Sequence, residues 1–247
     1  MPQSIPQSYV GKPAVIIGTG PSLDPNRDLR KLWKIGSPYF VKVGVNDVFK
    51  YMPLDVHVTV NPEWWEYNVR TGYWSLLAEM AHGGRCWHSD AATSNLYGLR
   101  NFGWFDVEDP RGLSLHPDKI NLGHSSGFAA LNISYLMGCN PIYLLGHDMK
   151  YPSDYNAQRK DPGGKRHFFG EYAAPLQHWP SVKVGKRGEL DGLIALYERV
   201  ARQMDRGLMA CGSGGNFLEI YNVTPGSALT CFPTMTLDEA IARHAIP

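Results

Sequence analysis

The chain reads Ala14-Val15-Ile16-Ile17-Gly18-Thr19-Gly20-Pro21-Ser22-Leu23 close to its start. Four apolar residues in a row are typical of a buried strand of a parallel sheet, and the glycines that follow allow a tight turn. A helix is expected next over residues 24–35, with Pro25 in its first turn and Gly36 after its end. This strand–turn–helix unit predicts an α/β fold.

The same alternation continues along the chain. Further strands are expected at residues 39–45, 56–60, 85–88, 142–145, 208–211 and 218–221. Further helices are expected over residues 64–81, 125–137 and 190–204, with a last short helix opened by a capping box at Thr236 and Glu239. Gly72 is unfavourable inside the first of these helices, and residues 91–120 show no sustained period. The sequence therefore predicts a Rossmann-like fold, with a mainly parallel sheet and helices on both faces.

The composition excludes several classes of protein. With 24 Lys and Arg against 23 Asp and Glu, the formal net charge is +1, so we expect no nucleic-acid partner. No apolar run approaches the roughly 20 residues of a membrane span, and residues 1–12 lack the basic leader and apolar core of a signal peptide. Four widely spaced cysteines predict reduced side chains in a cytoplasmic protein: Cys86, Cys139, Cys211 and Cys231. We expect residues 1–247 to form one domain, and assembly into a homo-oligomer stays open.

A long polar segment, residues 150–187, interrupts this order. A segment of this length without a core pattern is usually functional, so we interpret it as a lid inserted in the domain. It carries eight basic residues against three acidic ones. This excess of positive charge favours an anionic ligand such as a nucleotide sugar.

Three strand ends carry candidate binding residues, and the first is the loop that contains Gly18, Thr19, Gly20, Pro21 and Ser22. Its glycines let the backbone approach a ligand, and the following helix offers N–H groups suited to phosphate. Leu23 stands where a dinucleotide fingerprint needs glycine, and no Gly-Lys-Ser/Thr follows as in a P-loop. A tight connection without a ligand is the alternative interpretation.

The second and third candidates follow other strands. Asn46, Asp47 and Asn61 offer side chains to a base, ribose or phosphate, although a cap or an Asx turn is the favoured explanation when they are taken alone. The third candidate combines a helix start with a strand end: Ser125, Ser126 and Gly127, then Gly146 and Asp148. A serine could cap that helix beside an anionic ligand, and Asp148 could bind a ribose, a sugar hydroxyl or a metal. His124 and His147 flank these motifs and could be ligands, but lone histidines are more often polar loop residues, and no metal-binding spacing is present.

Taken together, these motifs resemble those of the bacterial sialyltransferases of glycosyltransferase family 42. They resemble more closely the related domain of Maf-type flagellin glycosyltransferases and of archaeal 6-hydroxymethyl-dihydropterin diphosphokinases. The resemblance covers residues 14 to about 170. It depends on the glycine loop of residues 18–23 together with the Ser-Gly helix and the Gly-x-Asp strand end.

The resemblance implies a metal-independent, inverting transfer of a nonulosonic acid from a CMP-linked donor to a glycan or other hydroxyl acceptor, without a cofactor. Residues 18–22 and Asn46 would hold the CMP, and residues 125–127 would lie against the nucleotide and the donor sugar. His167 would be the base, as histidine suits that role near neutral pH. Tyr151 or Tyr155 would steady the departing phosphate.

The chain departs from the sialyltransferase motifs at two positions, and two alternative functions remain open. Thr19 replaces an asparagine of the sialyltransferases, and Lys150 stands where they carry a tyrosine. In the diphosphokinases the same scaffold binds ATP with magnesium, and Asp47 with Asp148 would then be ligand candidates. A non-catalytic protein that binds a nucleotide or nucleotide sugar is the other alternative.

Overall fold

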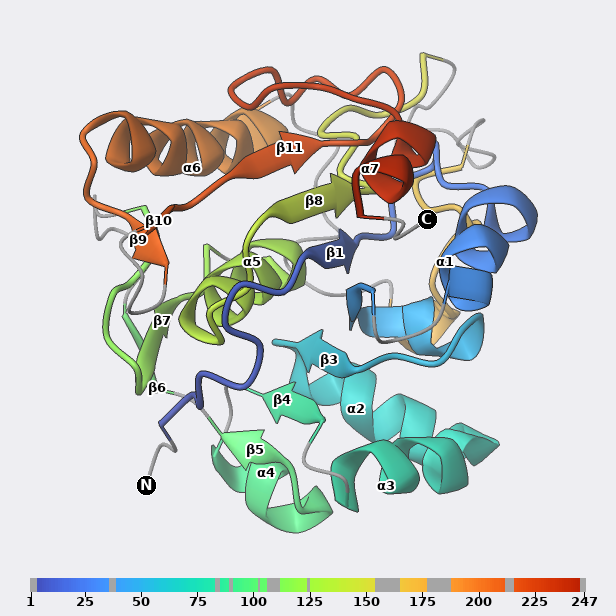
Figure 1. Cartoon of the computed structure of the whole chain (residues 1–247). Coiled ribbons are helices and arrows are strands. Elements are labelled where there is room, and N and C mark those ends of the chain that lie inside the picture. Colours follow the sequence, from blue (N-terminus) through green and yellow to red (C-terminus); the bar gives the residue numbers. More distant parts are fainter. Residues whose placement is uncertain are drawn as a thin grey trace.

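A seven-stranded sheet forms the centre of the protein in a computed structural model, with strand order β11-β8-β1-β2-β3-β4-β5 (Figure 1). The structure describes residues 4–35, 39–82, 85–88, 91–101, 103–105, 112–123, 125–153, 165–176, 188–211 and 216–244. All pairs in this sheet are parallel. Its strands are β1 (Ala14–Ile17), β2 (Val41–Val45), β3 (Val56–Thr59), β4 (Cys86–His88), β5 (Arg100–Asn101), β8 (Ile142–Leu145) and β11 (Ile220–Asn222).

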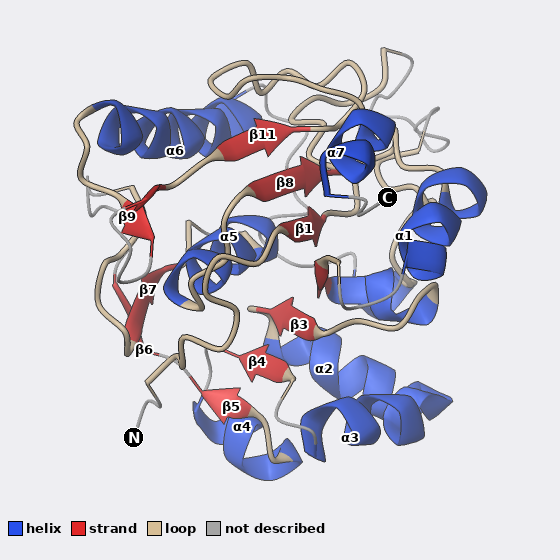
Figure 2. Cartoon of the chain, viewed as in Figure 1, coloured by secondary structure: helices blue, strands red, loops and turns tan. Residues whose placement is uncertain are grey.

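Helices cover both faces of this sheet (Figure 2). They are α1 (Arg30–Ile35), α2 (Pro62–Asn68), α3 (Trp74–His82), α4 (Ala91–Tyr97), α5 (Ser126–Leu136), α6 (Gly188–Asp205) and α7 (Leu237–His244). Successive residues of β1 enter different cores: Ala14 and Ile16 pack with α5 and α6, whereas Val15 and Ile17 pack with α1, α2, α3 and α7. Because both faces are buried, β1 needs a continuous apolar run. The α/β, Rossmann-like prediction is confirmed.

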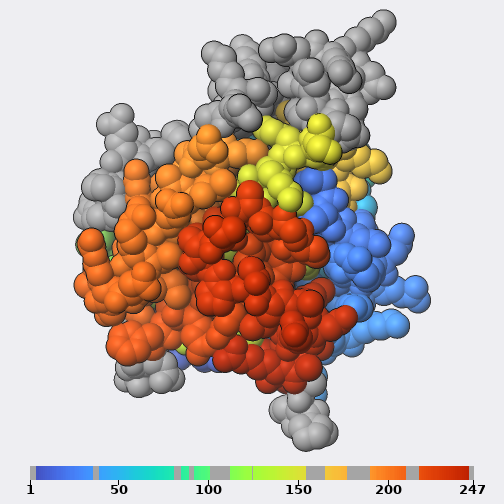
Figure 3. Space-filling model, turned by 90° about the horizontal axis from the view of Figure 1, so that it is seen from above, coloured from blue at the N-terminus to red at the C-terminus, as the bar shows by residue number. Residues whose placement is uncertain are grey.

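The upper edge of the sheet is covered by the C-terminal part of the chain. Seen from above, α6 and residues 216–244, which include β11, form much of the visible surface (Figure 3). None of the helices that the structure describes is long and apolar enough to cross a membrane.

Several predicted elements need correction. The helix expected over residues 64–81 is two helices, α2 and α3, because Gly72 has φ +94° and Thr71 leaves the helical region. Glycine adopts this left-handed conformation without a Cβ clash, so the chain bends there. The strand expected at residues 208–211 contributes only β9 (Ala210–Cys211), which pairs antiparallel with β10 (Asn216–Phe217) outside the main sheet.

The stretch without a sustained period contains short elements. Besides α4 and β5, it holds β6 (Gly103–Phe105), which pairs in parallel with β7 (Lys119–Asn121). A short helical segment, Pro25–Leu29, also precedes α1, so the helix predicted over residues 24–35 begins with a wider turn. Asp24 caps this turn by accepting hydrogen bonds from the N–H groups of Asn26 and Arg27.

Candidate functional site

The strand order changes direction between β1 and β8. From β1 the chain continues through β2, β3, β4 and β5 on one side, whereas β8 and β11 lie on the other. In open α/β sheets, ligands bind beyond the carboxyl ends of the strands at such a switch point. Ile17 lies opposite Leu145 in the ladder, so the loops after β1 and β8 leave the sheet side by side.

These two loops are in close contact. The Gly20 N–H donates to the Gly146 carbonyl over 2.9 Å. A Cβ at Gly20 would lie 1.8 Å from Oδ2 of Asp148, so no side chain fits there. Asp148 accepts hydrogen bonds from the backbone N–H of Ser22 over 3.1 Å and from its hydroxyl over 3.0 Å. Burial raises the pKa of Asp148, and the bonds from Ser22 act in the opposite direction. The loop of residues 18–23, called the glycine turn below, therefore has a packing role as well as any role in binding.

A cavity of about 900 Å³ opens beside these loops. Its lining includes thirteen of the predicted site residues: Gly18, Thr19, Gly20, Pro21, Asn46, Asn61, Ser125, Ser126, Gly127, Gly146, Asp148, Tyr151 and His167. The structure thus brings the glycine turn and the Ser-Gly helix start to one cavity, as expected. Ser22 and Asp47 do not line it. Tyr155 and His124 lie outside the described residues, as does much of the expected lid.

The start of α5 faces this cavity through residues 125–127. The first N–H groups of an α-helix have no acceptor within the helix, so they are available to an anion. The expected serine cap is absent at this helix start: Ser125 occupies the N-cap position without a side-chain cap bond. Ser126 instead donates its hydroxyl to Oδ1 of Asn46 over 3.0 Å and accepts from the N–H of Val60 over 3.3 Å. The serine hydroxyl therefore connects the helix start to the ends of β2 and β3.

Asn46 connects three parts of the site. Its φ of +47° places it in the left-handed region, which asparagine tolerates better than most residues. Besides its contact with Ser126, its Nδ2 donates to the Tyr172 hydroxyl over 3.0 Å. Its carbonyl oxygen accepts from Nε2 of His57 over 3.0 Å. Asn46 thereby joins α5, β3 and the segment of residues 165–176.

His167 lies within hydrogen-bond distance of the glycine turn. Its Nδ1 lies within hydrogen-bond distance of Oγ1 of Thr19, 3.0 Å away, and the neighbouring Phe168 N–H donates to the Thr19 carbonyl over 3.1 Å. The His167 ring stacks on Phe169 with centroids 5.2 Å apart and planes 10° apart. Burial, and secondly the charge of Arg166, lowers the pKa of His167 to about 4. The imidazole is therefore neutral at pH 7 and able to accept a proton.

The charge of the cavity is mainly positive. Lys150, Arg166 and Arg199 line it, and Asp148 is the single carboxylate among its described lining residues. Arg166 also pairs with Glu171, through Nε at 2.8 Å. Another histidine, His147, also lines the cavity; it is buried rather than an exposed loop residue, and its burial lowers its pKa to about 4.

Sequence reasoning missed Arg199 and Tyr172, which the fold brings to the cavity from α6 and from the segment of residues 165–176. Tyr172 lies five positions after His167, and this proximity was its only sequence signal. Arg199 carried no signal, because it looks like any cation on an amphipathic helix.

Asp47 is separated from the cavity by its own contacts. Its Oδ1 accepts from Nε1 of Trp64 over 2.6 Å, and its Oδ2 pairs with Nζ of Lys50 at 3.0 Å. Among the residues that the structure describes, no group of three His, Cys, Asp or Glu could hold a metal ion. Asp47 is held away from the cavity and Asp148 lines it, so the two carboxylates that the diphosphokinase alternative would use do not share this cavity.

No family model matches the chain, and no curated protein matches it. What the site does must therefore be inferred from its own geometry and from its motifs.

Proposed function

We propose that this protein is a glycosyltransferase that moves a nonulosonic acid-type sugar from a CMP-activated donor to an acceptor hydroxyl. The observation that carries this proposal is the position of His167, a neutral histidine attached to the glycine turn in the switch-point cavity. The resemblance of the glycine turn, the Ser-Gly helix and the Gly-x-Asp strand end to family 42 sialyltransferases supports the choice of donor.

The cavity suits a nucleotide sugar in size and charge. Its volume of about 900 Å³ lies in the range of ordinary ligand pockets, about 300–1,000 Å³. The phosphate of the donor would meet the first N–H groups of α5 and the nearby cations Lys150, Arg166 and Arg199. Asn46 also lines the cavity, and its side-chain amide would meet the nucleoside. A CMP-linked donor therefore finds both an anion site and neutral hydrogen-bonding groups.

The proposed reaction is a direct displacement. The acceptor oxygen forms a bond to the anomeric carbon while the bond from that carbon to the phosphate oxygen breaks. The acceptor proton passes to Nε2 of His167, which requires the tautomer in which Nδ1–H donates to Oγ1 of Thr19. CMP leaves with the electron pair, and the helix N–H groups and cations stabilise its charge. The negative charge of the bound donor would raise the pKa of His167 towards the working pH.

A ligand screen by thermal shift tests this function. CMP and CMP-sialic acid should each stabilise the protein without magnesium, by about 5–10 °C at a hundredfold excess over Kd. CDP and ATP, with and without magnesium, complete the screen. Stabilisation by ATP only with magnesium would favour the diphosphokinase instead. Binding of CMP-sialic acid without any transfer or hydrolysis would favour the non-catalytic binding protein.

Two variants on one helix locate the response. Arg199→Gln removes a cation that lines the cavity, whereas Arg202→Gln removes an exposed cation of α6 that pairs with Glu198. The CMP-induced shift should fall in the first variant and persist in the second. An equal shift in both would place the nucleotide elsewhere.

A further inference from the structure

A second hollow lies on the surface beside α1, with a volume of about 420 Å³. We call it the α1 groove; it is lined by Pro25, Asn26, Arg30, Trp33, Lys34 and Tyr51. It shares no lining residue with the cavity of the proposed active site. The spacing of Arg30, Trp33 and Lys34 puts these three side chains on one face of α1.

The α1 groove presents two aromatic rings to solvent. Trp33 is 58% exposed and Tyr51 is 39% exposed. Both rings belong to a concave surface of the size that small ligands occupy. Aromatic side chains of this kind offer large, rigid contact faces to a ligand.

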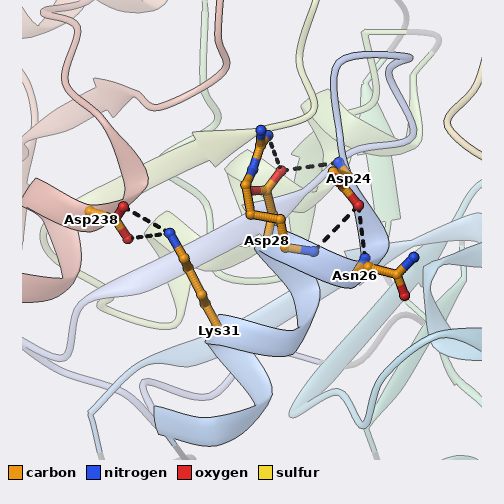
Figure 4. A network of polar contacts seen from close by, with 6 residues as sticks. Asp24, Asn26, Asp28, Lys31 and Asp238 are labelled. Carbon is orange, nitrogen blue, oxygen red and sulfur yellow. Dashed lines mark hydrogen bonds and ion pairs between the residues drawn. The ribbon is translucent and has the colours of Figure 1, made fainter.

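The two cations of the α1 groove lack carboxylate partners in the described part of the chain, because the neighbouring acids are bound to other groups (Figure 4). Asp28 pairs with Nε of Arg27 at 2.7 Å, and Asp238 pairs with Nζ of Lys31 at 2.6 Å. Asp24 accepts hydrogen bonds from the backbone N–H groups of Asn26 and Arg27, just before α1. Arg30 and Lys34 are therefore available to an anion from solution.

A stack of rings links the α1 groove to the proposed catalytic base. Tyr51 and Phe169 stack with planes 17° apart and centroids 6.5 Å apart. Phe169 in turn stacks on His167, with planes 10° apart. Tyr51 also meets the edge of Phe168, with centroids 4.8 Å apart. Ring contacts thus run without a break from Tyr51, which lines the α1 groove, to His167, which lines the active-site cavity.

We propose that the α1 groove binds an acidic saccharide, which serves as the acceptor of the transfer. The apolar C–H faces of sugar rings pack on aromatic side chains. A sugar carboxylate pairs with the guanidinium group of Arg30 and with the ammonium group of Lys34. A nucleic acid is disfavoured, because its affinity depends on many phosphate contacts and the α1 groove offers two cations. Saccharide binding stands independently, whereas the acceptor role rests on the proposed transferase function.

The binding test uses calorimetric titration of the full chain with trigalacturonic acid and with maltotriose, a neutral trisaccharide. The acidic sugar should bind at least about tenfold more tightly than the neutral one. Trp33→Ala, and separately the double variant Arg30→Gln with Lys34→Gln, should each weaken its binding at least about tenfold. Equal affinities for the two sugars would overturn the proposal.

Matched controls separate the α1 groove from the general surface. Trp74→Ala removes another indole, 40% exposed, from α3, and Lys12→Gln with Arg206→Gln removes two exposed cations outside the α1 groove. Both controls should bind trigalacturonic acid as the wild type does. The same loss in the controls would overturn the proposal, as would tighter binding of a single-stranded oligonucleotide through Arg30 and Lys34.

A kinetic test isolates the acceptor role. With the CMP-activated sugar as donor, Trp33→Ala should raise the KM for an acidic acceptor at least about tenfold and leave donor hydrolysis unchanged. An unchanged acceptor KM would overturn the acceptor role. Failure of the proposed function has a different result: the wild-type protein would show no CMP-induced thermal shift but would still bind trigalacturonic acid.

Discussion

Oγ1 of Thr19 lies 3.0 Å from Nδ1 of His167, although the two residues are 148 positions apart in the chain. The Thr19 carbonyl also accepts from the N–H of Phe168 over 3.1 Å, so the turn holds this segment through both side chain and backbone. In the tautomer whose Nδ1–H donates to this hydroxyl, Nε2 is the nitrogen that can accept a proton from a substrate. The Thr19 hydroxyl therefore orients the proposed base.

The close contact of the two strand-end loops predicts that Gly20→Ala is strongly destabilising. The new Cβ would lie 1.8 Å from Oδ2 of Asp148 and 2.6 Å from the Gly146 carbonyl oxygen, so the loops must separate. We expect urea unfolding to show a loss of about 1–3 kcal/mol, the usual cost of overpacking, together with weaker CMP binding. Gly192→Ala is the control, because open space surrounds that helical glycine, and it should gain about 0.5–1 kcal/mol. Equal stabilities of the two variants would contradict this.

Two substitutions at Asn46 separate its backbone from its side chain. Asn46→Gly tolerates the φ of +47° and removes the contacts with Ser126 and Tyr172. Asn46→Ala removes the same contacts and adds left-handed strain of about 1–2 kcal/mol. We expect the alanine variant to unfold at lower urea concentration, whereas CMP affinity should fall equally in both. Wild-type CMP affinity in Asn46→Gly would show that the side chain does not contact the nucleotide.

Asp47→Asn distinguishes a structural carboxylate from a metal ligand. The substitution removes the charge that pairs with Lys50 and changes the acceptor of the Trp64 N–H. We expect a loss of about 1–3 kcal/mol in the free energy of unfolding. Nucleotide affinity should change little at any magnesium concentration. A loss of magnesium-dependent nucleotide binding would instead restore the diphosphokinase interpretation.

The fold could be predicted well where a segment is buried on both faces. The apolar runs of β1 and β8 are long enough to be recognised, and each ends in a glycine turn. The short edge strand β5 has two residues and carries no such pattern. The bend at Gly72 depends on one glycine, which a helix can tolerate or use to turn, and local sequence does not distinguish these outcomes.

The site could be predicted only in part, because sequence position does not tell where a side chain points. Asn46 and Asp47 are adjacent, yet the first lines the cavity while the second binds Trp64. Tyr172 and Arg199 reach the cavity through packing of distant segments, which no local spacing encodes. Strand-end loops were predictable because parallel strands place their carboxyl ends together.

Buried histidines predict a marked loss of stability in acid. Burial lowers the pKa of His57, His147 and His167 to about 4, and it also lowers that of His244. The unfolded chain binds these protons near pH 6.5 and the folded protein does not, so stability is full above that pH and falls towards pH 4. The raised pKa of Asp148 acts in the opposite direction at the acid end.

The slope of stability against pH measures this effect. Each of His57, His147 and His167 contributes about 1.4 kcal/mol per pH unit within the window, so urea unfolding at pH 7.5, 6 and 5 should show a steep decline. His57→Gln keeps a donor for the Asn46 carbonyl and should reduce the slope by about one proton. An unchanged slope would mean that His57 titrates normally in the folded protein.

His167→Ala separates a transferase from a protein that only binds. If His167 takes the acceptor proton, turnover should fall by about 10²–10⁴-fold, the usual contribution of general base catalysis. CMP affinity should change little, because Nε2 faces the acceptor.

The pH profile of the wild type gives a second measurement. The acid limb of the kcat/KM profile should have its midpoint near the free-enzyme pKa of about 4. The acid limb of the kcat profile should lie at higher pH, because bound donor adds negative charge. Both limbs should disappear in His167→Ala and persist in His116→Ala, whose exposed side chain lies outside the cavity lining. Equal turnover in wild type and His167→Ala would remove His167 from the mechanism and leave the nucleotide site intact, since the two depend on different groups.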